Sequence, residues 1–479
     1  MIEQSLPVAV IGAGPVGLAA AAHLIARGET PIVFEAGETV GHAIRQWAHV
    51  PMFSPWAYCV DAAAARLLAA TGWQHPPHDE IPSGGDIVAR YLEPLAALPV
   101  MQPRIHLRSR VSAVTRRGFD KVRTEGRMAR PFVLRVVGAD GRERQVEAKA
   151  VIDASGTLAA PNPAGSDGLP AIGEPAAADR IYYGIPDVLD RHRARYQGKA
   201  TMVVGGGHSA LNALIELAEL GESDPAMRIV WVLRKESIEA AFGGGEADAL
   251  PARGALGSQA RALVESGAIQ VASPFRIERI ERQADGAPTV IGDLAGEEER
   301  IVVDEMIVAT GFRPDLSFLR EIRLSLDPWL ESSGTIGPLI DPNLHSCGTV
   351  RPHGAKELAH PETGFFIAGI KSYGRAPTFL LATGHEQVRS IVAALAGDQE
   401  AAERVELSLP ETGVCNTRPV KRGYATVADA APGGCCGGPA PAKVDACCAA
   451  DAQAKQAGAK GCGCGPSKSA WQELAGLGG

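Results

Sequence analysis

Short apolar runs alternate with small-residue turns and longer helical patterns over most of the chain. The first run, Pro7–Ile11, predicts a buried strand, and the Ala-rich stretch Leu18–Ala26 predicts a helix after it. The run Thr30–Phe34 predicts the next strand. Strands that alternate with helices in this way are typical of an α/β protein with parallel sheets. The same reasoning predicts further strands at Ile105–Thr115, Phe132–Val137, 149–153, 200–204, Ile229–Leu233, 301–310 and 364–369, and helices at Asp61–Thr71, Ile87–Leu98, Leu211–Leu220 and Thr378–Leu395.

The turn between the first strand and the first helix carries three regularly spaced glycines. Gly12 permits a tight turn, Gly14 lets the backbone approach a pyrophosphate, and Gly17 lets the helix pack on the strand. The helix N-terminus, at Pro15, offers free N–H groups to phosphate oxygens. Glu35 ends the second strand, where a carboxylate can accept hydrogen bonds from ribose hydroxyls. Together, these features predict a dinucleotide site.

A second copy of this pattern lies near the middle of the chain. Its turn, with alanine at the third glycine position, is formed by Gly205, Gly207, His208, Ser209 and Ala210. Its second strand ends at Arg234 instead of an acid. A guanidinium favours a 2′-phosphate, which a carboxylate would repel, and a charge-assisted hydrogen bond contributes about 1.5–3 kcal/mol. The first turn is therefore predicted to bind a dinucleotide without a 2′-phosphate, and the second to bind NADPH.

Length and charge narrow the class of protein. The 479 residues are enough for two or three domains. A net charge of −8 and the lack of a basic stripe argue against a nucleic-acid partner. No apolar run is long enough to span a bilayer, so we expect no membrane association. Because no Lys or Arg precedes the first apolar strand, no signal peptide is predicted, and we expect a cytoplasmic protein.

The nine cysteines are unevenly distributed along the chain. Cys59, Cys347 and Cys415 are isolated in the sequence. The others gather in a tail from Ala430 onward, where Ala, Gly, Pro and Cys predominate, and we predict that residues 430–479 are disordered. In a cytoplasmic chain, clustered cysteines suggest soft-metal or redox chemistry, not structural disulfides. The tail cysteines are Cys435, Cys436, Cys447, Cys448, Cys462 and Cys464.

Two further strands end in small-residue turns, at Ser155–Gly156 and within the segment Ala309–Asp315. With the two glycine turns, these motifs resemble flavoproteins that have two dinucleotide-binding domains, a group that includes flavin-containing monooxygenases, thioredoxin reductase and the pyridine nucleotide-disulfide reductases. The resemblance implies FAD at the first turn and NADPH at the second, in two Rossmann-like domains. It also implies that the NADPH domain is inserted into a discontinuous FAD domain. The implied organisation is an FAD domain at 1–165 and 306–400, an NADPH domain at 166–305, a linker at 401–429 and the tail at 430–479.

Further cofactor residues follow from the same resemblance. Thr310 and Gly311 match the link between the two domains, and Gly369 matches the end of the strand before the flavin-facing helix. The family usually has aspartate after that glycine, whereas this chain has Ile370, which changes the expected contact to the flavin ribityl chain. Arg45, in the loop after the first acid, is a candidate phosphate contact.

Two absences distinguish this chain within the group. The globular part has no Cys-x-x-Cys or Cys-x4-Cys dithiol, which thioredoxin reductase and lipoamide-type reductases need. The Phe-x-Gly-x-x-x-His motif of the flavin-containing monooxygenases is also missing. The segments 52–58, 345–354 and 371–381 are instead similar to flavin-dependent monooxygenases encoded in bacterial arsenic-resistance operons. That resemblance implies a trivalent arsenic substrate.

The cysteines are the candidate ligands for such a substrate, because trivalent arsenic is thiophilic and three thiolates can hold it in a pyramid. Cys59, Cys347 and Cys415 form the candidate metalloid site in the body of the protein. The alternative for each of them alone is that it is a small, buried apolar residue. The paired tail cysteines are candidate ligands for metalloid capture, because adjacent cysteines form a strained disulfide. The alternative is that the tail is a dispensable extension.

Three functions remain open from the sequence. The first is an FAD- and NADPH-dependent monooxygenase that uses O2 to oxidise arsenic(III). The second is an NADPH-dependent metalloid or thiol reductase that passes electrons through the cysteine tail. The third is a flavoprotein that binds a metalloid without turnover. In the monooxygenase the flavin carries the chemistry, so no catalytic side chain is assigned.

Overall fold

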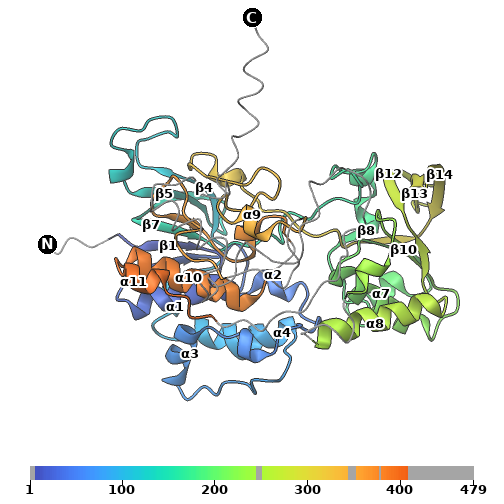
Figure 1. Ribbon diagram of the computed structural model, residues 1–479, viewed down its shortest axis with the longest axis horizontal. Coiled ribbons are helices and arrows are strands. Elements are labelled where there is room, and N and C mark those ends of the chain that lie inside the picture. The colour runs from blue at the N-terminus through green and yellow to red at the C-terminus, as the bar shows by residue number, and fades with distance from the viewer. Residues whose placement is uncertain (1–5, 244–250, 344–351, 377–378, 408–479) are drawn as a thin grey trace, which may run out of the picture. The chain divides into compact units, whose positions relative to one another are not determined.

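The computed structural model describes residues 6–243, 251–343, 352–376 and 379–407 (Figure 1). Two five-stranded parallel sheets and two three-stranded antiparallel sheets make up the described β-structure. None of the described helices is long and apolar enough to cross a membrane. The parallel sheets confirm the predicted α/β class.

The first parallel sheet carries the first glycine turn at its edge. Its strand order is β16 (Phe365–Ile367), β7 (Ala150–Asp153), β1 (Val8–Ile11), β2 (Pro31–Phe34) and β3 (Ile105–His106). All neighbours are parallel, and Ile11 lies opposite both Phe34 and Asp153. The carboxyl ends of the three strands β1, β2 and β7 therefore meet at one edge, where open α/β sheets bind ligands.

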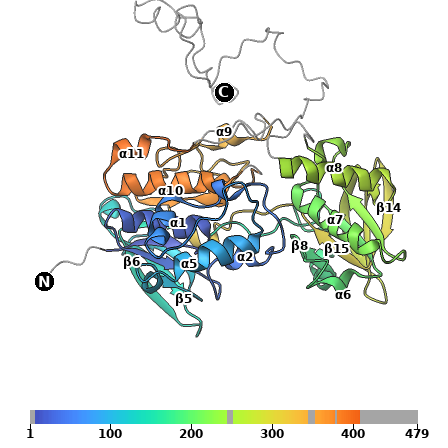
Figure 2. The same cartoon turned by 90° about the horizontal axis from the view of Figure 1, so that it is seen from below.

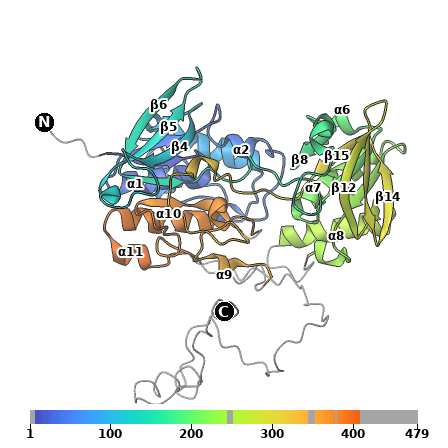
Figure 3. The ribbon, with the colours of Figure 1, turned by 90° about the horizontal axis from the view of Figure 1, so that it is seen from above.

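Alternate residues of β1 bury the two faces of this sheet. Val8 and Val10 pack in one core with α1 (Pro15–Ala26) and α10 (Leu381–Leu395), which lie side by side in Figures 2 and 3. Ala9 and Ile11 pack in a second core with the antiparallel sheet β4 (Arg110–Arg116), β5 (Phe132–Val137) and β6 (Glu143–Ala148). Both faces are apolar because both are covered, as is usual for a parallel sheet.

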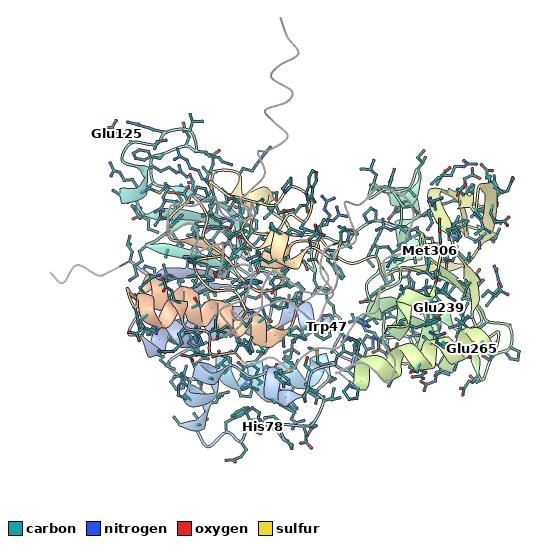
Figure 4. All side chains as sticks on the ribbon, viewed as in Figure 1. Trp47, His78, Glu125, Glu239, Glu265 and Met306 are labelled. Carbon is teal, nitrogen blue, oxygen red and sulfur yellow. The ribbon has the colours of Figure 1, made fainter. Side chains whose placement is uncertain are left out.

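Shorter helices complete the first core and the connections. Trp47, labelled in Figure 4, lies so close to Gly84 that an added Cβ there would come within 2.7 Å of the indole ring. The short helices are α2 (His42–Arg45), α3 (Ala62–Ala69), α4 (Gly84–Ile87), α5 (Glu93–Ala96), α6 (Arg193–Tyr196), α9 (Gly337–Ile340) and α11 (Gln399–Glu403).

The second parallel sheet has the order β11 (Gln270–Ala272), β10 (Arg228–Val232), β9 (Ala200–Val204), β15 (Glu305–Val308) and β8 (Ile181–Tyr183). Val203 and Trp231 pack in one core with α7 (His208–Gly221) and α8 (Pro251–Glu265). Met306, labelled in Figure 4, is fully buried in the core on the other face, with β12 (Phe275–Arg282), β13 (Pro288–Leu294) and β14 (Glu297–Val302).

The second sheet is an insertion within the first. All of its strands lie in the sequence between β7 and β16, so the first sheet is discontinuous, as the resemblance implied. The residue boundaries of the two domains stay a prediction. The tail 430–479 lies outside the described residues.

Two predicted strands are wrong in extent. The strand predicted at 105–115 breaks into β3 and β4, because Arg108 has φ +48° and its N–H donates to the Gly37 carbonyl at 2.8 Å. The strand predicted at 301–310 is the end of β14 followed by β15. It breaks at Asp304, whose carboxylate accepts a hydrogen bond from the Ala200 N–H at 2.8 Å. The helix predicted from Leu18 begins instead at Pro15, because proline suits the first helical position.

Candidate functional site

The first glycine turn is shaped by close backbone approaches. Gly12 has φ +99°, and an added Cβ would lie 2.6 Å from the Ala154 carbonyl oxygen. A Cβ on Gly17 would overlap the Gly12 carbonyl oxygen, so side chains are excluded at both positions. Gly14 is the N-cap residue of α1 and has no side chain that could bond to the free N–H groups of the first turn, and Pro15 follows it. The helix N-terminus is thus left to a ligand, which suits a pyrophosphate.

Glu35 holds the loop on the other side of this turn. Its Oε2 accepts a hydrogen bond from the Ala13 N–H and its Oε1 accepts one from the Gly37 N–H, both at 2.8 Å. Each carboxylate oxygen keeps a second lone pair, which can accept a ribose hydroxyl. Glu35 is only partly buried, so those lone pairs are within reach of a ligand.

A hollow of about 350 Å³ lies against the loop that follows Glu35. Its residues come from the loop after β2, the start of β4 and the β5–β6 turn. The lining is Ala36, Glu38, Arg108, Arg110 and 137–139. The hollow therefore adds space next to the loop that Glu35 holds, while the cradle at Gly12 and Gly17 with Glu35 beside it fits a dinucleotide.

Two further predicted cofactor residues differ in their surroundings. Gly369 has φ +73°, and its N–H donates to Oε1 of Gln387 on α10 at 2.8 Å. It lies against Val16 in the first turn of α1, so it belongs to the same edge as Gly12. Arg45, by contrast, forms an exposed ion pair with Glu93. A phosphate contact by Arg45 stays a prediction.

The second glycine turn repeats the close packing of the first. Gly205 has φ +130°, and an added Cβ would overlap the Ala309 carbonyl oxygen. Gly207 is the N-cap residue of α7, and it too has no side chain to bond to the free N–H groups of the helix. Ala210 is fully buried in the first turn of α7. The indole N–H of Trp231 donates to the Gly205 carbonyl at 2.8 Å. Trp231, which the sequence analysis did not identify, therefore fixes the orientation of this turn.

Ser209 and His208 begin α7. Ser209 is half-buried, and the His208 ring lies 4.8 Å from the ring of Phe53, centroid to centroid. Arg234 lies just beyond the end of β10, and its guanidinium donates to the Ser166 carbonyl at 3.1 Å. Arg234 is exposed, so a ligand can reach it.

Thr310 and Gly311 lie in the segment that leaves the second sheet. The Thr310 hydroxyl donates to the Asn162 carbonyl at 2.9 Å, and the Asn162 N–H donates to the Gly311 carbonyl at 2.9 Å. Gly311 has φ +88°. The predicted link therefore lies against the other connection between the sheets, a pairing that the sequence did not reveal.

Cys59 is the only cysteine among the described residues. It is fully buried, its thiol lies 3.5 Å from the carbonyls of Ser54 and Pro55, and burial raises its pKa to about 12. Within the described ranges, no group of three or more metal-binding side chains occurs. The other cysteines, Cys347, Cys415, Cys435, Cys436, Cys447, Cys448, Cys462 and Cys464, lie outside those ranges.

Residues 9–333 match the sequence model of the pyridine nucleotide-disulphide oxidoreductase family. The chain belongs to this family. It is therefore an oxidoreductase. None of the curated proteins compared with this chain matches it.

Solved structures agree with the fold. The bacillithiol disulfide reductase of Bacillus cereus is 21% identical, with a TM-score of 0.61, over 82% of this chain and 99% of that one. The FAD-bound cadaverine monooxygenase of Erwinia amylovora is 12% identical, with a TM-score of 0.58, over 85% and 99%. The ornithine N-hydroxylase of Kutzneria sp. 744 is 16% identical, with a TM-score of 0.55, over 83% and 100%. At these identities the likeness concerns the fold, which reductases and monooxygenases share.

Proposed function

We propose that this oxidoreductase binds FAD at the first glycine turn and NADPH at the second, and acts as a monooxygenase on a trivalent arsenic species. The observation that carries the proposal is the contrast between the two turns. Glu35 follows one and Arg234 follows the other, while both turns have glycines that exclude a Cβ. The acid suits a free ribose 2′-hydroxyl, and the arginine suits a 2′-phosphate.

The roles of the side chains follow from this assignment. Glu35 would hold the FAD ribose, and the Gly12–Gly17 turn would present the N-terminus of α1 to the pyrophosphate. Arg234 would exchange its bond to the Ser166 carbonyl for one to the NADPH 2′-phosphate. FAD supplies the two-electron chemistry when bound, while the chain orients it and limits access of water.

The cysteine content of the described residues argues against a dithiol-dependent reductase. They contain a single cysteine, Cys59, so they carry no redox pair of thiols. The structural neighbours include monooxygenases and a bacillithiol disulfide reductase, so the shared fold suits either activity. The arsenic assignment rests on the sequence motifs and on the cysteines at 59, 347 and 415. Because the Cys59 thiol is protonated at neutral pH, a metalloid would have to displace its proton.

NADPH oxidation by the full-length holoenzyme tests the proposal. The rate is measured with and without O2, and with and without arsenite, and arsenate is assayed as the product. Arsenite-stimulated turnover that requires O2 and yields arsenate supports the monooxygenase. Turnover without O2 selects a metalloid or thiol reductase, and tight arsenite binding without turnover selects a binding protein.

The cysteines are tested in the same assay. Cys59, Cys347 and Cys415 are each replaced by serine, and a further variant ends at Ala430 to remove the tail. Loss of arsenite stimulation with intact basal NADPH oxidation supports a metalloid role for the residue removed. Unchanged kinetics in all three serine variants would exclude the trio as the substrate site.

A further inference from the structure

A buried ion pair lies at the carboxyl edge of the first sheet. Asp153 is the last residue of β7, and its Oδ2 lies 2.7 Å from Nζ of Lys371. Both side chains are fully buried. Lys371 lies in the 3₁₀-helix Gly369–Tyr373 that follows β16, so the pair joins the turns after two neighbouring strands.

Ser155 connects this ion pair by hydrogen bonds to the neighbourhood of the first glycine turn. Its hydroxyl donates to Asp153 Oδ1 at 2.6 Å and accepts a hydrogen bond from Lys371 at 3.0 Å. Its N–H also donates to Asp153 Oδ1, at 3.1 Å. A Cβ added to Gly12 would lie 3.0 Å from the Ser155 Cα, so the network borders that glycine. Ser155 itself is exposed.

The Gly369 turn, which the Asp153–Lys371 pair joins to the Ser155 turn, is also held by hydrogen bonds to α10. Gln387 accepts a hydrogen bond from the Gly369 N–H at 2.8 Å and donates from its amide to the Ser372 hydroxyl at 2.9 Å. The Ser372 hydroxyl donates in turn to the Gly369 carbonyl at 2.7 Å. The 3₁₀-helix that carries Lys371 is therefore anchored to α10 through Gly369 and Ser372, while the Lys371 ammonium group lies against Asp153 of β7.

The energetics make a purely stabilising role a poor explanation for the pair. Removing a lysine and an aspartate from water is costly, and a well-packed apolar pair of similar volume is often equally stable. A buried pair does fix geometry, because each charge must stay beside its partner. Here the geometry that it fixes is the separation of the Ser155 turn, which borders Gly12, from the Gly369 turn, which borders Val16 in the first turn of α1.

We propose that the Asp153–Lys371 pair is a positioning device for FAD, which holds the Ser155 and Gly369 turns at the spacing that the dinucleotide requires. This inference rests on the proposed assignment of FAD to the first glycine turn. Neither residue touches the cofactor in this account: Asp153 orients Ser155, and Lys371 ties that turn to Gly369. The pair therefore acts on FAD affinity through backbone placement.

The test measures FAD affinity of the full-length apoprotein by quenching of flavin fluorescence. In the double variant Asp153→Asn/Lys371→Met both groups are neutral, so no unpaired charge stays buried. The matched control is Glu29→Gln/Lys149→Met, which removes another lysine–carboxylate pair beside β7, at the amino end of that strand. Thermal unfolding of each apoprotein is recorded in the same preparations.

The expected result is a rise of at least tenfold in the FAD dissociation constant of the Asp153→Asn/Lys371→Met protein, with less than a twofold change in the control. Ser155→Ala, which leaves the ion pair in place, should raise the dissociation constant severalfold, and Ser155→Thr should restore it. An affinity within twofold of wild type in both the double variant and Ser155→Ala overturns the inference alone. Failure of the wild-type chain to bind FAD overturns the proposed function with it.

Discussion

The Asn162 side-chain amide donates to the Thr310 carbonyl at 3.1 Å, and the Thr310 hydroxyl donates back to the Asn162 carbonyl at 2.9 Å. These two residues lie on the two segments that connect the parallel sheets. Pro161 and Phe312 form an antiparallel bridge beside them. The connections between the two halves of the chain are therefore hydrogen-bonded to each other, and they form a short two-stranded link.

This reciprocal pairing should appear as an energetic coupling. Asn162→Ala and Thr310→Val are each expected to lower the free energy of unfolding by about 1 kcal/mol, the usual net value of a hydrogen bond. The loss in the double variant should fall short of the sum by about 0.5 kcal/mol or more, because both substitutions disrupt one network. Urea unfolding of the four proteins measures the coupling.

Ser266→Ala provides the control for this cycle. Its hydroxyl donates to the Leu263 carbonyl within one helical turn, at an exposed site far from the link in sequence. Combined with Thr310→Val, it should give additive losses. A coupling as large as that of the Asn162–Thr310 pair would show that the cycle reports general destabilisation and not the link.

Arg234 is expected to determine the choice between NADPH and NADH. Arg234→Ala should raise the KM for NADPH about 10–100-fold, because a charge-assisted bond of about 1.5–3 kcal/mol is lost. The KM for NADH should change less than twofold, since NADH has no 2′-phosphate. Steady-state rates with both nucleotides give the ratio. Arg276→Ala, which removes another exposed arginine from the same half of the chain, should leave both constants unchanged.

Equal losses with NADPH and NADH would contradict this assignment. Such a result would mean that Arg234 supports the backbone through Ser166 and does not read the 2′-phosphate.

Glu35 is expected to be needed for FAD binding. Glu35→Gln replaces one acceptor oxygen by an amide donor, which cannot accept a bond from the Ala13 or Gly37 N–H. The FAD dissociation constant should rise about tenfold or more, because a hydrogen bond to a charged group contributes about 1.5–3 kcal/mol. Glu125→Gln, at an exposed position between β4 and β5 and outside the hollow, is the control and should have little effect. Titration of the apoproteins with FAD compares the two, and equal losses would refute the ribose role.

Local patterns in the sequence were enough to locate both glycine turns. Gly12, Gly17 and Glu35 act within one strand–turn–helix–strand unit, so their spacing alone indicates their geometry. The insertion of the second sheet into the first was expected from the resemblance to flavoproteins that have two dinucleotide-binding domains.

Contacts between distant segments could not be predicted in this way. Lys371 follows an apolar run and gives no sign that its partner is Asp153, because only the parallel register of β7 and β16 brings the two together. The pairing of Asn162 with Thr310 has the same origin. Arg108 interrupts the stretch 105–115, whose sequence predicts a single strand. It adopts φ +48°, and its N–H donates a hydrogen bond to the Gly37 carbonyl.

Glu216 on α7 should make stability depend on pH near neutrality. Its pKa is raised to about 7, mainly by burial and also by the nearby Asp187 and Glu219, while a hydrogen bond from the Val188 N–H lowers it. Its Oε1 lies 3.6 Å from Nε2 of His49, whose own pKa is lowered by burial. The contribution of this pair therefore depends on the protonation of Glu216.

The direction of the effect follows from the raised pKa. Between pH 4.5 and pH 7 the folded protein keeps the Glu216 proton that the unfolded chain has lost, so stability falls as pH rises through this range. Glu216→Gln removes this loss. Relative to wild type, the variant should gain about 1–2 kcal/mol between pH 5 and pH 8, once solvent screening of the partly exposed carboxyl is allowed for.

Urea unfolding of both proteins at pH 5 and pH 8 measures the difference in their free energies of unfolding. Ionisable groups that both proteins share contribute almost equally to each and largely cancel in this difference. Glu222→Gln, an exposed glutamate at the end of the same helix, should show no such change. A Glu216→Gln protein whose stability relative to wild type is the same at both pH values would mean that Glu216 ionises normally in the folded chain. In that case the contact with His49 would be an ordinary ion pair, and replacing either partner would weaken the protein at neutral pH.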